Sequence, residues 1–214
     1  MIVFLALIAR DVRLAWSGGA WLPLTFFLLV AILYPFGVGP DSALLARTGG
    51  GVLWIAALLA ALLPVDRLVA PDAESGVLDQ LAVRGVSEEL VATAKWIAHW
   101  LSFGPPLMLA ALPASALLRI EGATLLRLEA GLAIGTPALA ALGIMAASLT
   151  LGVRRSGALA GLLILPLAVP LLIFGAGSLA PMPGSALMLL GAVSLLFCAM
   201  LPFAAGAAIR AARQ

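Results

Sequence analysis

Charged and reactive side chains are scarce in this chain of 214 residues, of which only 10% are Asp, Glu, Lys or Arg. A soluble domain would carry about a quarter charged residues. Cys198 is the single cysteine, so no intramolecular disulfide can form, and no Cys-x-x-Cys-His run exists for covalent haem attachment. His99 is the single histidine, too little for a metal site or a Ser/His/Asp triad. An enzyme is therefore disfavoured, and we expect the chain itself to bind no cofactor or metal.

A nucleotide-binding loop is also missing. The Gly-x-x-x-x-Gly-Lys-Ser/Thr pattern does not occur, and Lys95, the only lysine, follows Thr93 and Ala94 without the glycines. We therefore predict that the chain does not hydrolyse ATP. Any work against a gradient has to be powered by a partner.

Long apolar stretches are abundant in the sequence, in which 64% of the residues are hydrophobic. A helix needs ~20 residues to cross a ~30 Å hydrocarbon layer, where unpaired backbone groups find no partners. Stretches near this length predict an all-α membrane protein with six transmembrane helices, folded as one domain over residues 1–214. The six uncharged stretches are 20–36, 49–65, 97–118, 130–153, 157–178 and 185–209.

Basic residues are distributed unevenly over the predicted loops. With the N-terminus inside, nine lie in inner segments and three in outer ones, namely Arg47, Arg119 and Arg127. Because cytoplasmic loops carry the excess of Lys and Arg, both termini are predicted to be cytoplasmic. The outer loops, 37–48, 119–129 and 179–184, are too short to form a receptor or an extracellular enzyme.

Residues 1–16 are predicted to form an amphipathic helix in the membrane interface. Apolar residues recur at helical spacing, while Arg10, Asp11 and Arg13 mark a polar side. A simple extension of the first crossing is the alternative. Trp16 and Trp21 are expected at headgroup depth.

The longest polar segment, residues 66–95, holds six of the ten acidic residues. Pro71 suits the start of a helix because it lacks the amide that would be unpaired there, and Ser87 is a good N-cap for the helix that runs into the third crossing. We expect a short lateral helix between these points, beneath the second and third crossings on the cytoplasmic side.

Prolines are frequent within the predicted crossings. Pro166 and Pro170 are one turn apart and should bend the fifth crossing. Plain packing of kinked membrane helices is the favoured explanation, and a hinge for transport is the alternative. For His99, an interfacial position between aromatic residues is favoured over a ligand role.

The polar segment resembles a known element. Residues 74–81, Glu-Ser-Gly-Val-Leu-Asp-Gln-Leu, are similar to the Glu-x-Gly-Thr-Leu-Glu-x-Leu run of type-2 ABC transporter permeases. Together with further stretches, this run identifies the chain as similar to the B-subunit permease of the haem exporter of cytochrome c maturation, the CcmB family. The chain departs from the family pattern at Pro64, near Gly85, and in having Asp79 for Glu and Val77 for Thr. The further stretches are 34–47, 66–68, 94–101, 135–155 and 165–175.

The resemblance implies a bacterial inner-membrane permease subunit for ATP-driven haem export to the periplasm, in c-type cytochrome biogenesis. ATP would be bound by a cytoplasmic ABC ATPase subunit, with haem as a possible substrate. A haem-handling membrane subunit, a small accessory membrane subunit and membrane lipid would be its other partners, and no nucleic acid. The run at 74–81 would be the coupling helix, and the residues expected to contact the ATPase are Glu74, Gly76, Leu78, Asp79 and Leu81.

Two further functions stay open from the sequence. One is a type-2 ABC permease for a lipid or polysaccharide. The other is a non-transporting scaffold that couples ATP hydrolysis to the release of a haem-loaded chaperone. Measured haem flux separates the exporter from the scaffold, and stimulation of ATP hydrolysis by lipid or polysaccharide marks the other permease.

Overall fold

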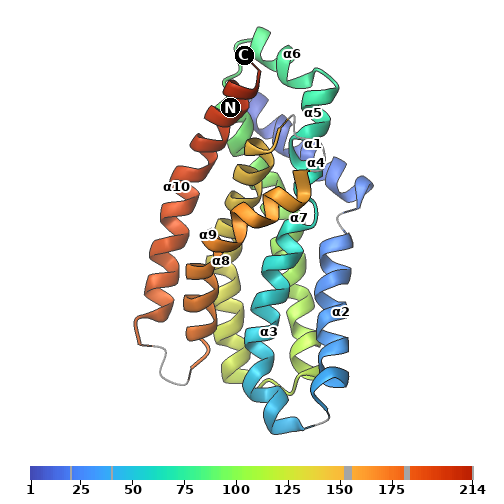
Figure 1. The fold of residues 1–214 in the computed structure, drawn as a ribbon, viewed down its shortest axis with the longest axis vertical. Coiled ribbons are helices and arrows are strands. Elements are labelled where there is room, and N and C mark those ends of the chain that lie inside the picture. The colour runs from blue at the N-terminus through green and yellow to red at the C-terminus, as the bar shows by residue number, and fades with distance from the viewer. Residues whose placement is uncertain (20, 40, 152–155, 181–183, 214) are drawn as a thin grey trace.

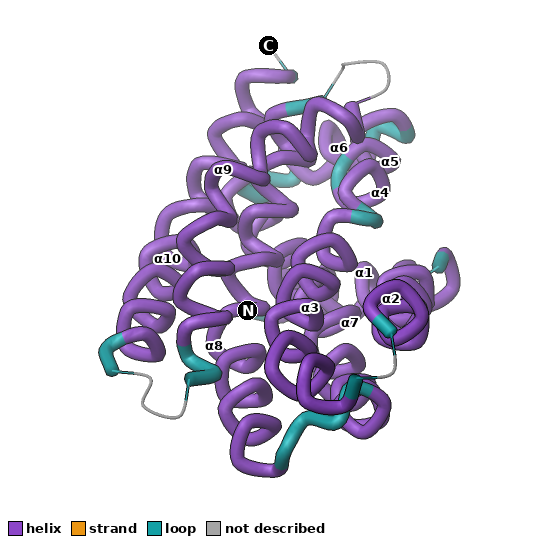
Figure 2. Tube along the Cα trace, turned by 60° about the horizontal axis from the view of Figure 1, so that its bottom comes forward, coloured by secondary structure: helices purple, strands orange, loops and turns teal. Residues whose placement is uncertain are grey.

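The chain folds entirely into helices and loops. The computed structural model describes residues 1–19, 21–39, 41–151, 156–180 and 184–213, with the backbone alone over 156–163. Every regular element within these ranges is a helix, as Figures 1 and 2 show, which confirms the predicted all-α class. The helices are α1 (Ile2–Gly18), α2 (Trp21–Val38), α3 (Ser42–Leu62), α4 (Val65–Leu68), α5 (Ala70–Glu74), α6 (Val77–Val83), α7 (Glu88–Leu117), α8 (Gly122–Leu149), α9 (Ser156–Gly177) and α10 (Ala186–Ala212).

Five of the described helices, α2, α3, α7, α8 and α10, are long and apolar enough to cross a membrane. The chain is therefore a multi-pass membrane protein. Most of the membrane-crossing stretch of α8 is buried inside the bundle, whereas only 17% of the corresponding stretch of α2 or α10 is buried. Exposed apolar side chains on α10, such as Met188 and Leu195, are what a lipid-facing helix requires.

Helix α9 is the fifth predicted crossing in chain order, and it is bent. Its part with described side chains, Ile164–Gly177, is apolar but shorter than the other five helices. Pro166 and Pro170 lie inside α9, where proline removes a backbone hydrogen bond and crowds the preceding turn. Figure 1 shows the first part of α9 running across the bundle and the rest running along it. The bend is confirmed, and a hinge motion at these prolines stays a prediction.

Trp54 of α3 forms the centre of the bundle and is completely buried. Glycines of α8 and α9 surround its indole ring so closely that side chains would not fit. A Cβ at Gly135 would lie 2.6 Å from Trp54 Cη2, and one at Gly175 would lie 2.6 Å from Trp54 Cε2. Three helices therefore meet on one aromatic ring, which fixes their spacing.

Two tryptophans of α7 contact α8 at the point where Pro137 interrupts the backbone hydrogen bonds of that helix. Trp96 donates its indole N–H to the carbonyl of Pro137 at 2.8 Å, and Trp100 donates to Thr136 Oγ1 at 3.1 Å. Gly104, one turn after Trp100, leaves room for its ring. The helix therefore continues through Pro137 because its neighbour supplies the stabilising contacts.

Two connections predicted as outer loops are much shorter than the sequence suggested. Asp41 caps α3 by accepting hydrogen bonds from the backbone amides of Ala43 and Leu44, so the helix begins at residue 42 and includes Arg47. Helix α8 begins at Gly122, which places Glu129 about two turns inside the helix. The predicted boundaries at residues 49 and 130 were wrong because helices continue past the first charged residue when a cap or turn lies further out.

The predicted N-terminal helix is present as α1. A turn at Gly19, with φ of +116°, separates it from α2, so α1 is not an extension of the first crossing. Trp16 and Trp21 meet edge to face across this turn, with ring centroids 5.1 Å apart. The location of α1 in the membrane interface stays a prediction, as does the role of residues 66–95 in coupling.

Candidate functional site

The short helices α4, α5 and α6 cap the end of the bundle that carries both termini (Figure 1). In Figure 2 they follow one another on the same side of the molecule. The sequence predicted a single lateral helix here, and the structure corrects this. Gly76 has φ of +73°, a conformation that side chains disfavour, and it separates α5 from α6. We call residues 70–83 the α5–α6 platform.

The predicted contact residues differ in what they present to a partner. Glu74 and Asp79 are exposed, whereas Gly76 and Leu81 are half-buried. Leu78 is only 5% exposed, so its side chain packs inside this chain. The run from residue 74 to 81 therefore offers carboxylates to the outside and holds its own position with Leu78.

Val83 is the exposed apolar residue that sequence reasoning missed. Its side chain, at the end of α6, is 89% exposed. The sequence contained a signal for this exposure. Val83 stands directly before the turn at Arg84 and Gly85, so no further helical turn follows for its side chain to pack against. A large apolar side chain held this far outward is the type of residue that partner proteins bury.

An ion-pair cluster ties one side of the platform to α1 and α7. It consists of Arg10 and Asp11 of α1, Asp72 of α5 and Lys95 of α7; we call it the α1 cluster. Lys95 Nζ lies 2.5 Å from Asp72 Oδ2 and 3.2 Å from Asp11 Oδ2. Arg10 pairs with both carboxylates, at 2.6 Å from Asp11 Oδ1. The two positive and two negative side chains alternate, so no charge in the cluster lacks a partner.

Electrostatics favour the charged form of this cluster. Burial opposes ionisation of Asp72, but Lys95 and Arg10 outweigh it, and the pKa of the carboxyl lies below its ordinary value. Burial likewise opposes the charge on Arg10, but Asp11 and Asp72 hold the pKa of its guanidinium above the ordinary value. Asp72 and Arg10 are therefore both charged at neutral pH.

A second cluster ties the other side of the platform to the C-terminal helix; we call it the α10 cluster. Arg213, at the end of α10, contacts two carboxylates in this cluster. Its Nε lies 2.8 Å from Asp79 Oδ1, and its Nη1 lies 2.6 Å from Glu88 Oε1. Arg210 pairs with Glu88 and Glu89. These carboxylates lie on α6 and in the first turn of α7, so α10 holds both helices together.

Gly206 allows α10 to approach the start of α7 at the α10 cluster. A Cβ at this position would lie 2.7 Å from the backbone nitrogen and Cα of Glu89. Ser87 caps α7 as predicted, by accepting a hydrogen bond from the amide of Leu90. The close crossing brings Arg210 and Arg213 within reach of the carboxylates that follow the cap.

The side chain of His99 is buried inside the bundle and only 4% exposed, and its position at the depth of the membrane interface stays a prediction. Its Nε2 lies 3.2 Å from the carbonyl oxygen of Ala61 and therefore donates to it. Ala61 is in the last turn of α3, whose carbonyls have no intrahelical partner. Pro64, three residues further on, cannot supply an amide. His99 thus stabilises the end of α3, where the chain turns toward the platform.

Nothing in this arrangement resembles a redox or metal centre. No group of three His, Cys, Asp or Glu side chains that could hold a metal ion occurs in the part of the chain that the structure describes. That the chain itself binds no cofactor stays a prediction. The arrangement is mechanical: a small platform joined by two ion-pair clusters to α1, α7 and α10.

Comparison with known proteins gives matches along almost the whole chain. The family model described as CcmB protein matches residues 2–212. "Heme exporter protein B" of Rhodobacter capsulatus is 47% identical over 215 residues, covering 96% of this chain and 97% of that protein. The protein of the same name in Paracoccus denitrificans is 47% identical over 212 residues, with 96% and 97% covered. The Escherichia coli K12 protein is 36% identical over 220 residues, with 99% of this chain and all of that protein covered.

Proposed function

Because the chain belongs to the CcmB protein family, we propose that it is the membrane permease subunit of an ATP-driven haem exporter in c-type cytochrome biogenesis. The observation that carries this proposal is the match over residues 2–212, together with relatives named as haem exporter proteins. The chain is a transporter subunit and not itself an enzyme. Its sequence has no nucleotide-binding loop, so the energy comes from a cytoplasmic ABC ATPase subunit.

The α5–α6 platform is the ATPase contact in this proposal. Its exposed side chains include Glu74, Asp79 and Val83, two acidic and one apolar. Val83 supplies apolar area for a partner to bury, and the carboxylates orient the partner through its basic residues. Gly76 sets the angle between α5 and α6 through its backbone conformation, and Leu78 fixes the position of α6 by packing inside this chain.

The two clusters explain how motion of the platform reaches the membrane. Asp72 connects it to α1 and α7, and Asp79 connects it to α10 through Arg213. Force applied at α6 is therefore shared by three helices. A rigid-body shift of these helices is the class of movement by which a nucleotide-driven partner acts on a transporter.

Six crossings in the type-2 permease arrangement belong to the proposal, and connectivity supports α9 as one of them. The second half of α8 contacts α4, which precedes the platform, since a Cβ at Gly143 would lie 3.7 Å from Leu68 of α4. Helix α9 ends beside the start of α10, where a Cβ at Gly177 would lie 3.4 Å from Ala186 Cβ. Before this end, α9 runs first across the bundle and then along it (Figure 1).

Location and partners complete the proposal. The platform and both termini face the cytoplasm of a bacterial inner membrane, because the basic residues gather at that end. A haem-handling membrane subunit and a small accessory membrane subunit bind the exposed helices, beside lipid. Haem is cargo or is handed on by the neighbouring subunit.

Co-expression with the ATPase encoded by a neighbouring gene tests the platform. Val83→Asp places an unpaired charge in the proposed apolar contact, and it should lower the recovered ATPase about tenfold or more. Ala43→Asp is the matched control, because Ala43 is exposed in the first turn of α3 at the other end of the bundle. Failure of the unmodified chain to recover any ATPase, or equal recovery with both variants, contradicts the proposal.

Haem movement is tested separately with the purified complex in vesicles. ATP-dependent appearance of haem on the far side supports an exporter. ATP-dependent release of a haem-loaded chaperone without haem flux identifies the scaffold instead. Stimulation of ATP hydrolysis by a lipid or polysaccharide, with no effect on c-type cytochromes, identifies the other class of permease.

A further inference from the structure

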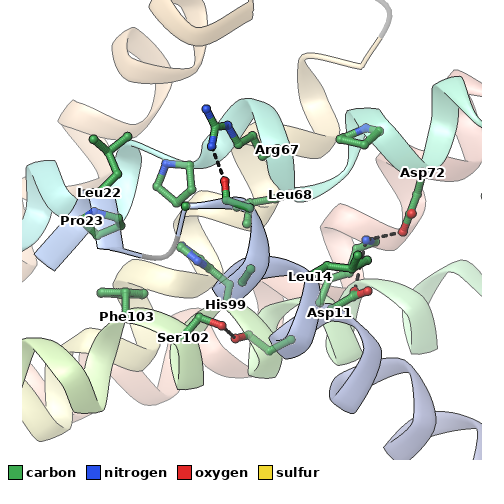
Figure 3. A pocket seen from close by; sticks show the side chains of 17 residues that line it. Asp11, Leu14, Leu22, Pro23, Arg67, Leu68, Asp72, His99, Ser102 and Phe103 are labelled. Carbon is green, nitrogen blue, oxygen red and sulfur yellow. Dashed lines mark hydrogen bonds and ion pairs between the residues drawn. The ribbon is translucent and has the colours of Figure 1, made fainter.

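A cavity of about 290 Å³ lies between the turn that joins α1 to α2, the α4–α5 segment and the middle of α7 (Figure 3). Its size is at the low end for sites that bind small molecules. The cavity adjoins the α1 cluster, because Asp11, Asp72 and Lys95 line it. It is distinct from the exposed outer surface of the platform, where the ATPase is proposed to bind.

The lining of this cavity changes from apolar to charged across its width. Figure 3 shows Leu22, Pro23 and Phe103 together on one side, with Asp11 and Asp72 on the other. An amphiphile, with an apolar end and a polar end, matches such a gradient. A fully polar solute would leave the apolar wall uncovered.

The charged side chains that line the cavity determine which polar group can bind there. Asp11, Asp72 and Lys95 are already neutralised within the α1 cluster. Arg67 of α4 lines the same cavity and is exposed, and its Nη1 donates to the carbonyl oxygen of Gly18 at 2.6 Å. The accessible charge is therefore a guanidinium, whose planar donors match the oxygens of a phosphate group.

The depth of the cavity matches the headgroup region of a bilayer. It lies at the turn between an amphipathic helix and the first helix able to cross the membrane. Trp16 and Trp21 pack together at this turn, and tryptophan concentrates at membrane interfaces. A phospholipid of the adjoining leaflet has its phosphate at this level.

We propose that this cavity is a phospholipid site in which Arg67 binds the lipid phosphate and the side formed by Leu22, Pro23 and Phe103 receives the start of an acyl chain. The rest of the lipid lies outside, along exposed apolar side chains of α2 such as Leu29 and Leu33. The bound lipid touches both the α1–α2 turn and α4, which leads into the platform. It therefore stabilises the position of α4 relative to α1 and influences how the platform moves.

Lipid retention by the full-length protein tests the site without any dependence on haem export. The protein is purified in mild detergent with phosphatidylglycerol, and bound lipid is counted by native mass spectrometry. Arg67→Gln should retain at least about tenfold less lipid, since a charge-assisted contact is lost. Arg13→Gln is the matched control, because Arg13 is an exposed arginine of α1 that does not line the cavity. Equal retention by both variants, or none by the unmodified chain, overturns the proposal.

A second variant separates loss of the site from loss of the fold. Ala15→Phe fills the cavity from α1 while Arg67 remains, so it should also release the lipid from protein that stays monodisperse. A photoactivatable phospholipid should cross-link to peptides covering residues 14–23 or 98–103, and Ala15→Phe should abolish this cross-link. Cross-links that are unchanged by the variant place the lipid elsewhere and overturn the proposal.

Competition identifies the source of the phosphate. Excess inorganic phosphate should leave the lipid bound, because it cannot cover the apolar side of the cavity. If inorganic phosphate displaces the lipid, the site binds a free anion and the lipid assignment is wrong. Displacement by haem at equal concentration would likewise overturn it.

Discussion

At the scale of single residues, charged side chains are few, so the partners of each one matter for stability. Asp72 is the clearest case, because it contacts basic residues from two other helices. In a chain with few charges, a buried charged side chain that loses its partner lowers the stability of the fold. The removal of one member of a buried pair destabilises a protein more than the removal of both.

We predict that Asp72→Asn lowers stability at neutral pH by about 1–3 kcal/mol, because Lys95 loses one of its two carboxylates. The pKa of Asp72 is lowered in the folded state, so its contribution is complete above its ordinary value of about 3.9 and is lost as pH falls through the folded pKa. The unmodified protein should therefore lose more stability below pH of about 4 than Asp72→Asn does. Thermal unfolding in detergent across this pH range measures both effects.

Glu74→Gln is the control for this prediction, because Glu74 is exposed on the same platform. It should change stability by less than about 0.5 kcal/mol at neutral pH. Parallel pH profiles for the unmodified protein and Asp72→Asn would contradict the role assigned to the α1 cluster.

The ring of Trp54 supports a second prediction at this scale. Gly135→Ala forces a methyl group to within 2.6 Å of Trp54 Cη2 and should cost about 1–3 kcal/mol. Gly51→Ala, in the same helix as Trp54, meets nothing within 4 Å and should be neutral or stabilising by up to about 1 kcal/mol. Unfolding temperatures of the two variants in one detergent compare them directly. Equal values would show that the ring tolerates closer packing.

At the scale of elements, the conformation of Gly76 decides the shape of the platform. A left-handed residue between α5 and α6 turns what would be one short helix into two. The consequence is that Leu78 points into the protein while Val83 is left outside. A straight helix would present a different set of side chains to the proposed ATPase partner.

We predict that Gly76→Ala costs about 1–2 kcal/mol, because L-residues are strained at φ of +73°. Gly76→Asn should cost less, since asparagine tolerates this conformation best among the other residues. The same order should appear in the amount of ATPase that co-purifies. If alanine and asparagine behave identically in both measurements, the backbone at Gly76 does not set the platform.

At the scale of the whole molecule, the two ends of the bundle differ in charge and in construction. Clustered ion pairs, both termini and the short helices lie at one end, and short turns between long helices lie at the other (Figure 1). This asymmetry supports the proposed orientation, because basic residues favour the cytoplasmic side.

Cysteine accessibility tests this orientation in a Cys198→Ser background. Ser75 is exposed on the platform and Ser42 is exposed at the start of α3, at opposite ends of the bundle. We predict that Ser42→Cys reacts with a membrane-impermeant maleimide in intact cells, whereas Ser75→Cys reacts only after permeabilisation. The reverse pattern would place the platform in the periplasm and contradict the proposed ATPase contact.

Several features were determined by the sequence alone because they depend on local chemistry. Apolar length and missing charge predicted a multi-pass helical membrane protein, and Ser87 marked where the helix into the third crossing begins. The CcmB resemblance also came from sequence, since the quoted runs are distributed between residues 34 and 175, and the family match confirms it. These features require no knowledge of which helices are neighbours.

Other features were decided only by tertiary structure, because they depend on residues far apart in the chain. Lys95 meets Asp11 across 84 positions, Arg213 meets Asp79 across 134, and His99 bonds to Ala61 across 38. No periodicity or local spacing encodes such pairs. The bend at Gly76 and the exposure of Val83 also depend on what Leu78 packs against. The sequence determined that this chain crosses a membrane many times, and the packing of its helices decided which side chains hold the platform and which face a partner.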